Sequence, residues 1–156
     1  MAARQRLERY LREEGVSFET LIHSLAYTAQ EVAAAQHTPG RQLAKVVLVD
    51  ADSQLVMLVL PASLRVDFPR LKSVLKAKKV RLATEEQFAG TFTDCEVGAM
   101  PPFGNLYGLQ VYVDESMAKA REIVFKSGSH STSIKMKYAD YERLAKPKTI
   151  DFAVHP

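Results

Sequence analysis

Leu43-Ala44-Lys45-Val46-Val47-Leu48-Val49 and Gln54-Leu55-Val56-Met57-Leu58-Val59-Leu60 are the two runs of sequence that decide the fold. Residues 50–53 (Asp-Ala-Asp-Ser) separate the two runs, and Pro61 follows the second. Nearly continuous apolar runs of this length are typical of strands that are buried on both faces. Two such runs joined by a short polar turn predict an antiparallel strand pair.

Lys45 does not fit the first apolar run. Period-2 alternation places it on the same face of the strand as Leu43, Val47 and Val49. A lysine in that position is costly unless it lines a cavity or meets an anionic partner. The alternative is a lysine at the edge of the strand that extends its ammonium group to water. Both interpretations are open, and Lys45 is a candidate functional residue.

A second unusual stretch is Gly98-Ala99-Met100-Pro101-Pro102-Phe103-Gly104. Proline fixes φ and lacks a backbone donor, whereas glycine admits positive φ, so this stretch predicts a stiff, shaped loop. Free backbone N–H groups on such a loop could hold an anion or polarise a carbonyl. The simpler alternative is a tight connection between two elements, which is the commonest meaning of clustered glycine and proline.

The rest of the chain mixes helices and strands without regular βαβ repetition. Apolar spacing and capping residues predict helices at 2–14, 28–37, 67–77, 84–88 and 138–145, with a helical turn at 114–116. Alternating patterns predict strands at 17–23, 80–83, 109–113, 122–126, 132–136 and 150–154. The mixture predicts an α+β fold. We expect a single domain over residues 1–156, because no repeat or long linker divides the chain.

The composition is that of an ordinary globular domain, with 47% apolar and 25% charged residues. No apolar run approaches the roughly 20 residues that span a bilayer, and no apolar segment follows the basic N-terminus, so we expect neither membrane nor signal peptide. Cys95 is the only cysteine, which excludes a disulfide framework and favours the cytoplasm. The net charge of +3 is compatible with a polyanionic partner.

The densest basic stretch comprises Arg70, Lys72, Lys76, Lys78, Lys79 and Arg81, with no acidic residue between Phe68 and Thr84. Such a stretch could follow a phosphate backbone. A solvated face is the more frequent reason for a run of like charges.

Several chemistries are excluded or disfavoured by the sequence. There is no phosphate-binding or dinucleotide-binding glycine motif, and His23, His37, His130 and His155 lack metal-ligand spacing, so we expect no metal or cofactor. Ser129-His130-Ser131 is a poor nucleophile–base pair, because adjacent residues rarely face each other. Cys95 remains an alternative nucleophile, although a small buried apolar side chain is its expected role.

Four segments occur in an order that suggests a family. They are Thr28-Ala29-Gln30-Glu31-Val32-Ala33, Ala44-Lys45-Val46-Val47, the stretch Gly98 to Gly104, and Ile123-Val124-Phe125-Lys126-Ser127-Gly128-Ser129-His130 with Asp140-Tyr141. From about Thr20 to Phe152 the chain resembles the YbaK/ProX family of free-standing aminoacyl-tRNA deacylases, which are similar to the editing domain of bacterial prolyl-tRNA synthetase. The resemblance implies a mixed, mostly antiparallel or barrel-like sheet surrounded by short helices.

The resemblance also implies an activity, which is hydrolysis of the ester between a wrong amino acid and its tRNA without a metal or a protein nucleophile. Lys45 matches the functional lysine of the family and would hold the terminal adenosine near its phosphate or ribose. Gly98 and Pro102 match the Gly-x-x-x-Pro loop, whose N–H groups would stabilise the oxyanion by on the order of 3 kcal/mol each. A ribose hydroxyl could activate the attacking water. The substrate would also contact Ala99, Met100, Pro101, Phe103, Gly104 and His130.

Alanine, cysteine, serine and threonine esters are all plausible substrates, since one methylene is worth only about 1–3 kcal/mol in an apolar pocket. The expected partners are aminoacyl-tRNA and, as a further candidate, a synthetase, and the chain is expected to be a monomer or weak dimer. The predicted tRNA contacts are Arg70, Lys72, Lys76, Lys78 and Lys79. Two alternatives stay open, a non-catalytic module that binds tRNA or a synthetase and a small-molecule hydrolase that uses Cys95.

Overall fold

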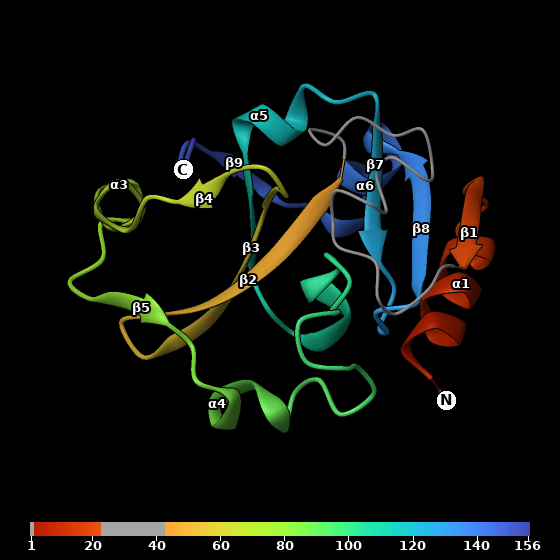
Figure 1. The fold of residues 1–156 in the computed structure, drawn as a ribbon, viewed down its shortest axis with the longest axis horizontal. Coiled ribbons are helices and arrows are strands. Elements are labelled where there is room, and N and C mark those ends of the chain that lie inside the picture. The colour runs from red at the N-terminus through yellow and green to blue at the C-terminus, as the bar shows by residue number, and fades with distance from the viewer. Residues whose placement is uncertain (1, 23–42) are drawn as a thin grey trace.

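The computed structural model describes residues 2–22 and 43–156 (Figure 1). The predicted helix 28–37, the family segment Thr28 to Ala33, His23 and His37 lie outside the described residues. The described elements are α1 (Ala3–Glu13), β1 (Phe18–Ile22), β2 (Ala44–Ala51), β3 (Gln54–Pro61), β4 (Arg65–Val66), α3 (Phe68–Leu75), β5 (Val80–Leu82), α4 (Glu85–Ala89), the 3-10 helix η2 (Gly104–Tyr107), β6 (Val111–Asp114), α5 (Glu115–Ala118), β7 (Glu122–Lys126), β8 (Thr132–Lys137), α6 (Tyr138–Ala145), β9 (Lys148–Ile150) and β10 (Ala153–Val154).

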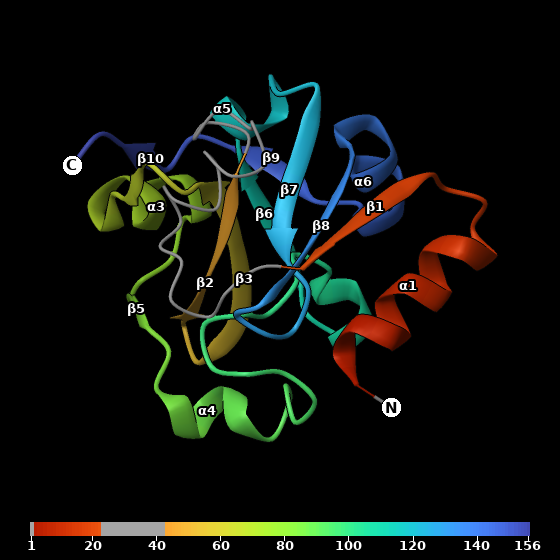
Figure 2. The ribbon, with the colours of Figure 1, turned by 45° about the vertical axis from the view of Figure 1, so that its right-hand side comes forward.

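The described strands form three sheets. The largest has the order β5-β2-β3-β6-β9, the second β1-β8-β7, and β10 pairs with β4. The β3–β6 and β6–β9 pairs are parallel, and all other strand pairs are antiparallel. A bridge between Leu43 and Val124 joins the start of β2 to β7, and Figures 1 and 2 show the two larger sheets beside each other at this point. The predicted α+β class with a mixed, mostly antiparallel sheet is confirmed.

The predicted strand pair is the centre of the largest sheet. Its register places Lys45 opposite Leu60 and Ala51 opposite Gln54. The turn is therefore shorter than the predicted 50–53, and its two residues, Asp52 and Ser53, both have positive φ. Pairing continues through Asp50 because its buried carboxylate is satisfied by Arg81 at 3.2 Å and by the amide of Gln87.

Both faces of the β2–β3 pair are covered, as its apolar sequence predicts. Met57 and Val59 on β3 pack in the larger core with α1 and α6, whereas Leu58 and Leu60 pack in a smaller core with Leu71 of α3. Full burial of each such side chain stabilises the fold by about 1.5–3 kcal/mol. The sheet is therefore fixed from both sides, and the residues at its edges are held in place.

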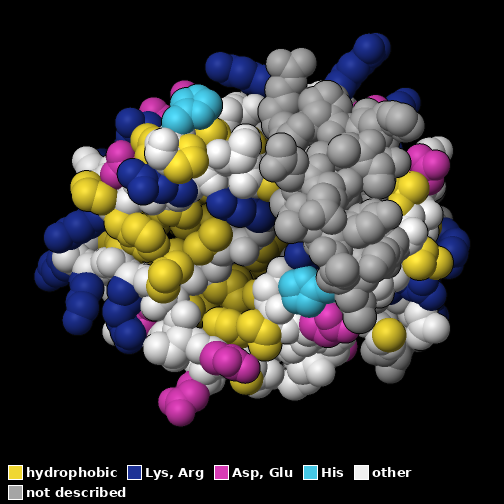
Figure 3. Space-filling view, in the orientation of Figure 1, with side chains coloured by type: hydrophobic (Ala, Val, Ile, Leu, Met, Phe, Trp, Pro, Cys, Tyr) yellow, Lys and Arg dark blue, Asp and Glu magenta, His cyan; other side chains and the backbone are white. Residues whose placement is uncertain are grey.

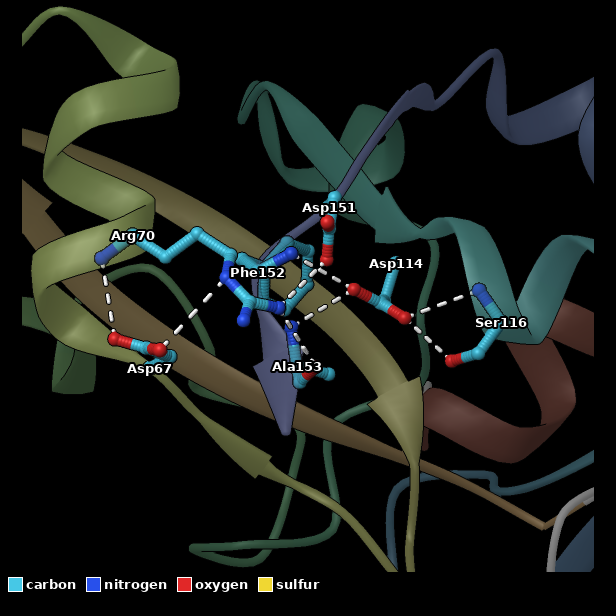
Figure 4. Close-up of polar contacts among 7 residues, drawn as sticks. All are labelled: Asp67, Arg70, Asp114, Ser116, Asp151, Phe152 and Ala153. Carbon is cyan, nitrogen blue, oxygen red and sulfur yellow. Dashed lines mark hydrogen bonds and ion pairs between the residues drawn. The ribbon is translucent and has the colours of Figure 1, made fainter. Parts of the chain in front are cut away.

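Two of the differences from the predicted bounds are explained by hydrogen bonds. The strand predicted at 109–113 starts at Val111, because the N–H of Leu109 bonds to Gly104 at the end of the 3-10 turn. The predicted strand at 150–154 is not continuous, since β9 ends at Ile150 and β10 is Ala153–Val154. They are separate because Asp114 Oδ1 accepts the N–H groups of Phe152 and Ala153, both at 2.8 Å, and bends the chain there (Figure 4).

No helix in residues 2–22 and 43–156 has the length and apolar character needed to cross a bilayer.

Candidate functional site

A pocket of about 230 Å³ lies where the start of β2, the end of β7 and the loop after Val97 meet. Its described lining consists of Leu43, Ala44, Lys45, Val46, Ala62, Gly98, Met100, Phe125, Lys126 and Ser133. The fold thus brings the unusual lysine and the glycine-proline loop, which are far apart in the sequence, to one cavity. Lys45 and the loop are both candidates from the sequence, and residues of both line this pocket.

Lys45 lines this pocket from β2 with its side chain partly buried. Burial disfavours the charged form and lowers the pKa of Lys45 below its ordinary value. Within the described residues, no carboxylate forms an ion pair with it. This placement supports the interpretation that Lys45 lines a cavity, and an ammonium group without an acidic partner among the described residues is suited to bind an anion.

The loop presents only part of its backbone to the pocket. Gly98 has φ +82°, a conformation that favours glycine, and a Cβ there would lie 3.5 Å from the His130 ring. Ala99 donates its N–H to the carbonyl of Glu96 at 3.0 Å. The two prolines carry no N–H. The N–H groups of Gly98 and Met100 meet no acceptor among the described residues, and both residues line the pocket.

The rest of the loop packs into the core. Phe103 is fully buried, and its ring makes edge contacts with Tyr10, Phe125 and Tyr141 at centroid distances of 6.3, 5.7 and 5.2 Å. The hydroxyl of Tyr141 donates to the carbonyl of Pro102 at 2.8 Å. Side chains from three helices and strands therefore fix the loop from behind.

Five predicted substrate contacts are not among the residues that line the pocket: Ala99, Pro101, Phe103, Gly104 and His130. Ala99, Pro101, Phe103 and Gly104 are buried behind the pocket, and a Cβ at Gly104 would lie 2.8 Å from Val111. These residues anchor the loop, whereas the exposed Gly98 and the buried Met100 line the pocket.

Lys126 is a pocket residue that the sequence analysis did not single out. Its Nζ lies 3.0 Å from Nδ1 of His130, and Nε2 of His130 lies 2.8 Å from the carbonyl of Val97. A carbonyl only accepts, so Nε2 carries the hydrogen and Nδ1 accepts from the ammonium group. Burial lowers the pKa of Lys126, opposed by the nearby charge of Glu96. Lys126 follows the apolar residues 123–125 of its strand, so like Lys45 it departs from the apolar pattern of its own segment.

His130 is placed between the pocket and the loop. Besides its two ring contacts, its backbone N–H donates to Glu96 at 3.1 Å. It does not pair with the neighbouring serines, since Ser129 Oγ bonds to Ser131 and Thr132. The structure thus agrees with the sequence argument against a Ser–His pair.

Cys95 is half-buried and lies outside the pocket. Burial is the main reason that its pKa is raised to about 11, and its Sγ contacts Asp94 and Tyr107. A thiol with this pKa is almost entirely protonated at neutral pH and is a poor nucleophile. Within residues 2–22 and 43–156, no three His, Cys, Asp or Glu side chains form a metal-binding group.

The predicted tRNA contacts lie on α3 and the segment that leads to β5, where Figure 3 shows Lys and Arg side chains gathered at the left edge. Arg70 pairs there with Asp67 and, at 2.9 Å, with Asp151. The backbone N–H groups of Lys78 and Lys79 bond to Asp52 and lower its pKa. Part of this basic charge is therefore compensated within the protein.

Comparison with known proteins identifies the class of this fold and site. The sequence model of the aminoacyl-tRNA editing domain family matches residues 23–144, and the chain belongs to this family. It is 29% identical over 153 residues to the multifunctional Ser/Thr-tRNA deacylase ProXp-y of Escherichia coli K12, covering 95% of this chain and 91% of the relative.

Solved structures show the same fold at low sequence identity. A candidate trans-editing enzyme for prolyl-tRNA synthetase has a TM-score of 0.84 with 18% identity, covering 99% of this chain and 98% of the other. The hypothetical protein APE2540 has a TM-score of 0.82 with 17% identity, covering 95% and 99%. The family resemblance, the fold and the enzyme class, an aminoacyl-tRNA deacylase, are confirmed.

Proposed function

We propose that the chain removes serine or threonine from mischarged tRNA by hydrolysing the aminoacyl ester in the pocket of Lys45. The observation that carries this proposal is that Lys45 lines one cavity of about 230 Å³ together with Gly98 and Met100, whose N–H groups have no acceptor among the described residues. Family membership supplies the reaction class, and the relative named as a Ser/Thr-tRNA deacylase supplies the substrate class.

The dimensions and lining of the pocket suit a small aminoacyl group. Its lining combines apolar residues such as Met100 and Phe125 with the polar residue Ser133. Discrimination by volume is weak, because one methylene changes binding by about 1–3 kcal/mol. Alanyl and cysteinyl esters are therefore the competing substrates that an activity panel must include.

In the proposed reaction, Lys45 and Lys126 hold the anionic terminal nucleotide of the tRNA. The N–H groups of Gly98 and Met100 donate to the ester carbonyl oxygen as negative charge develops on it. A water molecule forms the new carbon–oxygen bond while it gives a proton to the free hydroxyl of the terminal ribose, and that hydroxyl passes its own proton on to the departing ribose oxygen. The ester bond then breaks, and free amino acid and tRNA result.

Pro102 has an indirect role in this proposal. It has no N–H, and its carbonyl is occupied by Tyr141. It acts by fixing the loop so that Gly98 and Met100 face the pocket without rearranging during the reaction.

The test is deacylation of alanyl-, cysteinyl-, seryl- and threonyl-tRNA by the wild type, Lys45→Ala and the control Lys148→Ala, an exposed lysine on β9. We expect release of serine or threonine by the wild type and the control, and a loss of at least about 100-fold in Lys45→Ala. Tight tRNA binding without release would instead support a non-catalytic binding module.

The proposal has three further parts. We propose that the protein is cytoplasmic, that it docks on a synthetase, and that it is a monomer or weak dimer.

A further inference from the structure

A second hollow, of about 570 Å³, adjoins the pocket. Pro61, Ser63 and Leu64 line one side of it, and Lys119, Ala120 and Arg121 line another. Ala62 lines the pocket and both of its chain neighbours line the hollow, so the two cavities lie on either side of this one residue. We call this surface the basic hollow.

The cations of the basic hollow are not compensated within the described part of the protein. Lys119 and Arg121 are exposed, and neither forms an ion pair with a described carboxylate. The acidic residues that flank this segment in the sequence do not neutralise the two cations. Glu122 pairs with Lys135, and Glu115 does not line the hollow. In this respect the hollow differs from the basic stretch at α3 and β5, where Arg70 and Arg81 both have acidic partners.

Asp114 fixes two walls of the basic hollow relative to each other. One carboxylate oxygen accepts the N–H and the hydroxyl of Ser116, which lines the hollow. The other accepts from Phe152 and Ala153, just before the lining residue His155 (Figure 4). Asp114 is itself buried, so these bonds are shielded from water. The cavity is preformed in the free protein, which lowers the cost of ordering it around a ligand.

We propose that the basic hollow binds the single-stranded 3′ end of the tRNA immediately before its terminal adenosine. This inference rests on the proposed function, because an ester bound in the pocket obliges the preceding nucleotides to leave over an adjoining surface. Single-stranded nucleic acid is bound by cations that follow the phosphate backbone and by ring side chains on which bases stack. Lys119 and Arg121 supply the cations, the ring of His155 supplies a stacking face, and Pro61, Leu64 and Ala120 supply apolar contact.

The test compares equilibrium binding of two uncharged tRNAs, one intact and one lacking its last three nucleotides. The proteins are the wild type, Lys119→Gln/Arg121→Gln, and the matched control Lys137→Gln/Lys148→Gln, whose two lysines are exposed and outside the hollow. Each single-strand phosphate contact contributes about 0.7 to the slope of log affinity against log salt. We therefore expect the slope for intact tRNA to be shallower by about 1.4 in the hollow variant than in the wild type. Between 50 and 200 mM salt, the affinity of the variant should then fall about sevenfold less than that of the wild type.

The truncated tRNA separates the 3′ end from other parts of the molecule. We expect the hollow variant and the wild type to bind it equally. Equal weakening of both tRNAs by the variant would mean that the hollow contacts another part of the tRNA, and an unchanged slope for intact tRNA would mean no contact. Either result overturns the proposal. Melting temperatures of all variants show whether the fold is kept.

A minimal substrate separates this proposal from the proposed function. Seryl-adenosine carries the ester but none of the preceding nucleotides. We expect the hollow variant to hydrolyse it at the wild-type rate while its KM for seryl-tRNA rises. If the wild type hydrolyses neither substrate, the proposed function fails, and the binding comparison still decides whether tRNA occupies the hollow.

Discussion

The ammonium group of Lys126 and the imidazole of His130 are 3.0 Å apart, and the same imidazole lies 2.8 Å from the carbonyl of Val97. Because the ring must accept on one side and donate on the other, this arrangement requires the neutral Nε2–H tautomer. Val97 directly precedes Gly98. The histidine thus couples a pocket lysine on β7 to the first residue of the loop.

Replacement of His130 tests this coupling. His130→Ala removes the acceptor of Lys126 and the donor to Val97, and a net hydrogen bond contributes about 1 kcal/mol. We expect deacylation to slow by about tenfold, mainly through kcat because the loop donors lose their fixed position. Single-turnover kinetics of Ser131→Ala serve as the control. A His130→Ala enzyme with wild-type kinetics would make the histidine a surface residue without a role in positioning.

Removal of the Lys45 charge separates function from stability. Lys45 is partly buried without a described acidic partner, so its charge opposes folding. We expect Lys45→Met to abolish deacylation while its melting temperature stays equal to or above that of the wild type. Thermal unfolding followed by circular dichroism provides the measurement. A marked loss of stability would assign the lysine a structural role instead.

The lowered pKa of Lys45 predicts a pH dependence with a definite sign. Its folded pKa lies below the unfolded value, so the folded protein binds fewer protons in the window between them and its unfolding free energy rises with pH there. Anion binding has the opposite trend, since the ammonium group is lost as pH rises through the lowered pKa. As the pH is raised, the affinity for uncharged tRNA should begin to fall at a lower pH in the wild type than in Lys45→Arg. Coincident titration curves for the two proteins would contradict this.

Asp114 is predicted to be a stability determinant. Asp114→Ala leaves the buried N–H groups of Phe152 and Ala153 without their acceptor, and each such group costs about 1–3 kcal/mol. We expect a loss of about 3 kcal/mol in the free energy of unfolding, measured with urea. Asp114→Asn retains one acceptor oxygen and should lose less. Equal losses in the two variants would show that the charge matters more than the acceptor geometry.

Local sequence signals predicted most of the described elements. Thr84 caps α4 through a reciprocal bond with Gln87, as its position before two acidic residues suggests. The strand at 122–126 and the helix at 138–145 have the predicted bounds. Such signals depend on neighbours along the chain. The parallel pairing of β6 with β3 and β9, by contrast, joins distant segments, and nothing local in the sequence specifies it.

The residues of the candidate site likewise include some that local sequence signals identify and others that only the fold brings to the pocket. Lys45 and Gly98 were identifiable because each departs from the pattern of its own segment. Ser133 and Ala62 are ordinary residues in ordinary positions, and they line the pocket only because β8 and the end of β3 come together there. The basic hollow was equally hidden, since Lys119 and Arg121 flank a short turn rather than form a run of charges.

The contacts of Phe103 restrict how this enzyme could change its specificity. Since Phe103 belongs to the loop and its ring contacts α1, β7 and α6, a mutation that reshapes the loop would also disturb the packing of these three elements. New substrates are more accessible through the opposite wall, where Val46 and Ala62 line the pocket. Directed evolution of this chain should therefore accumulate its substitutions along β2 and after β3, and leave the glycine-proline loop unaltered.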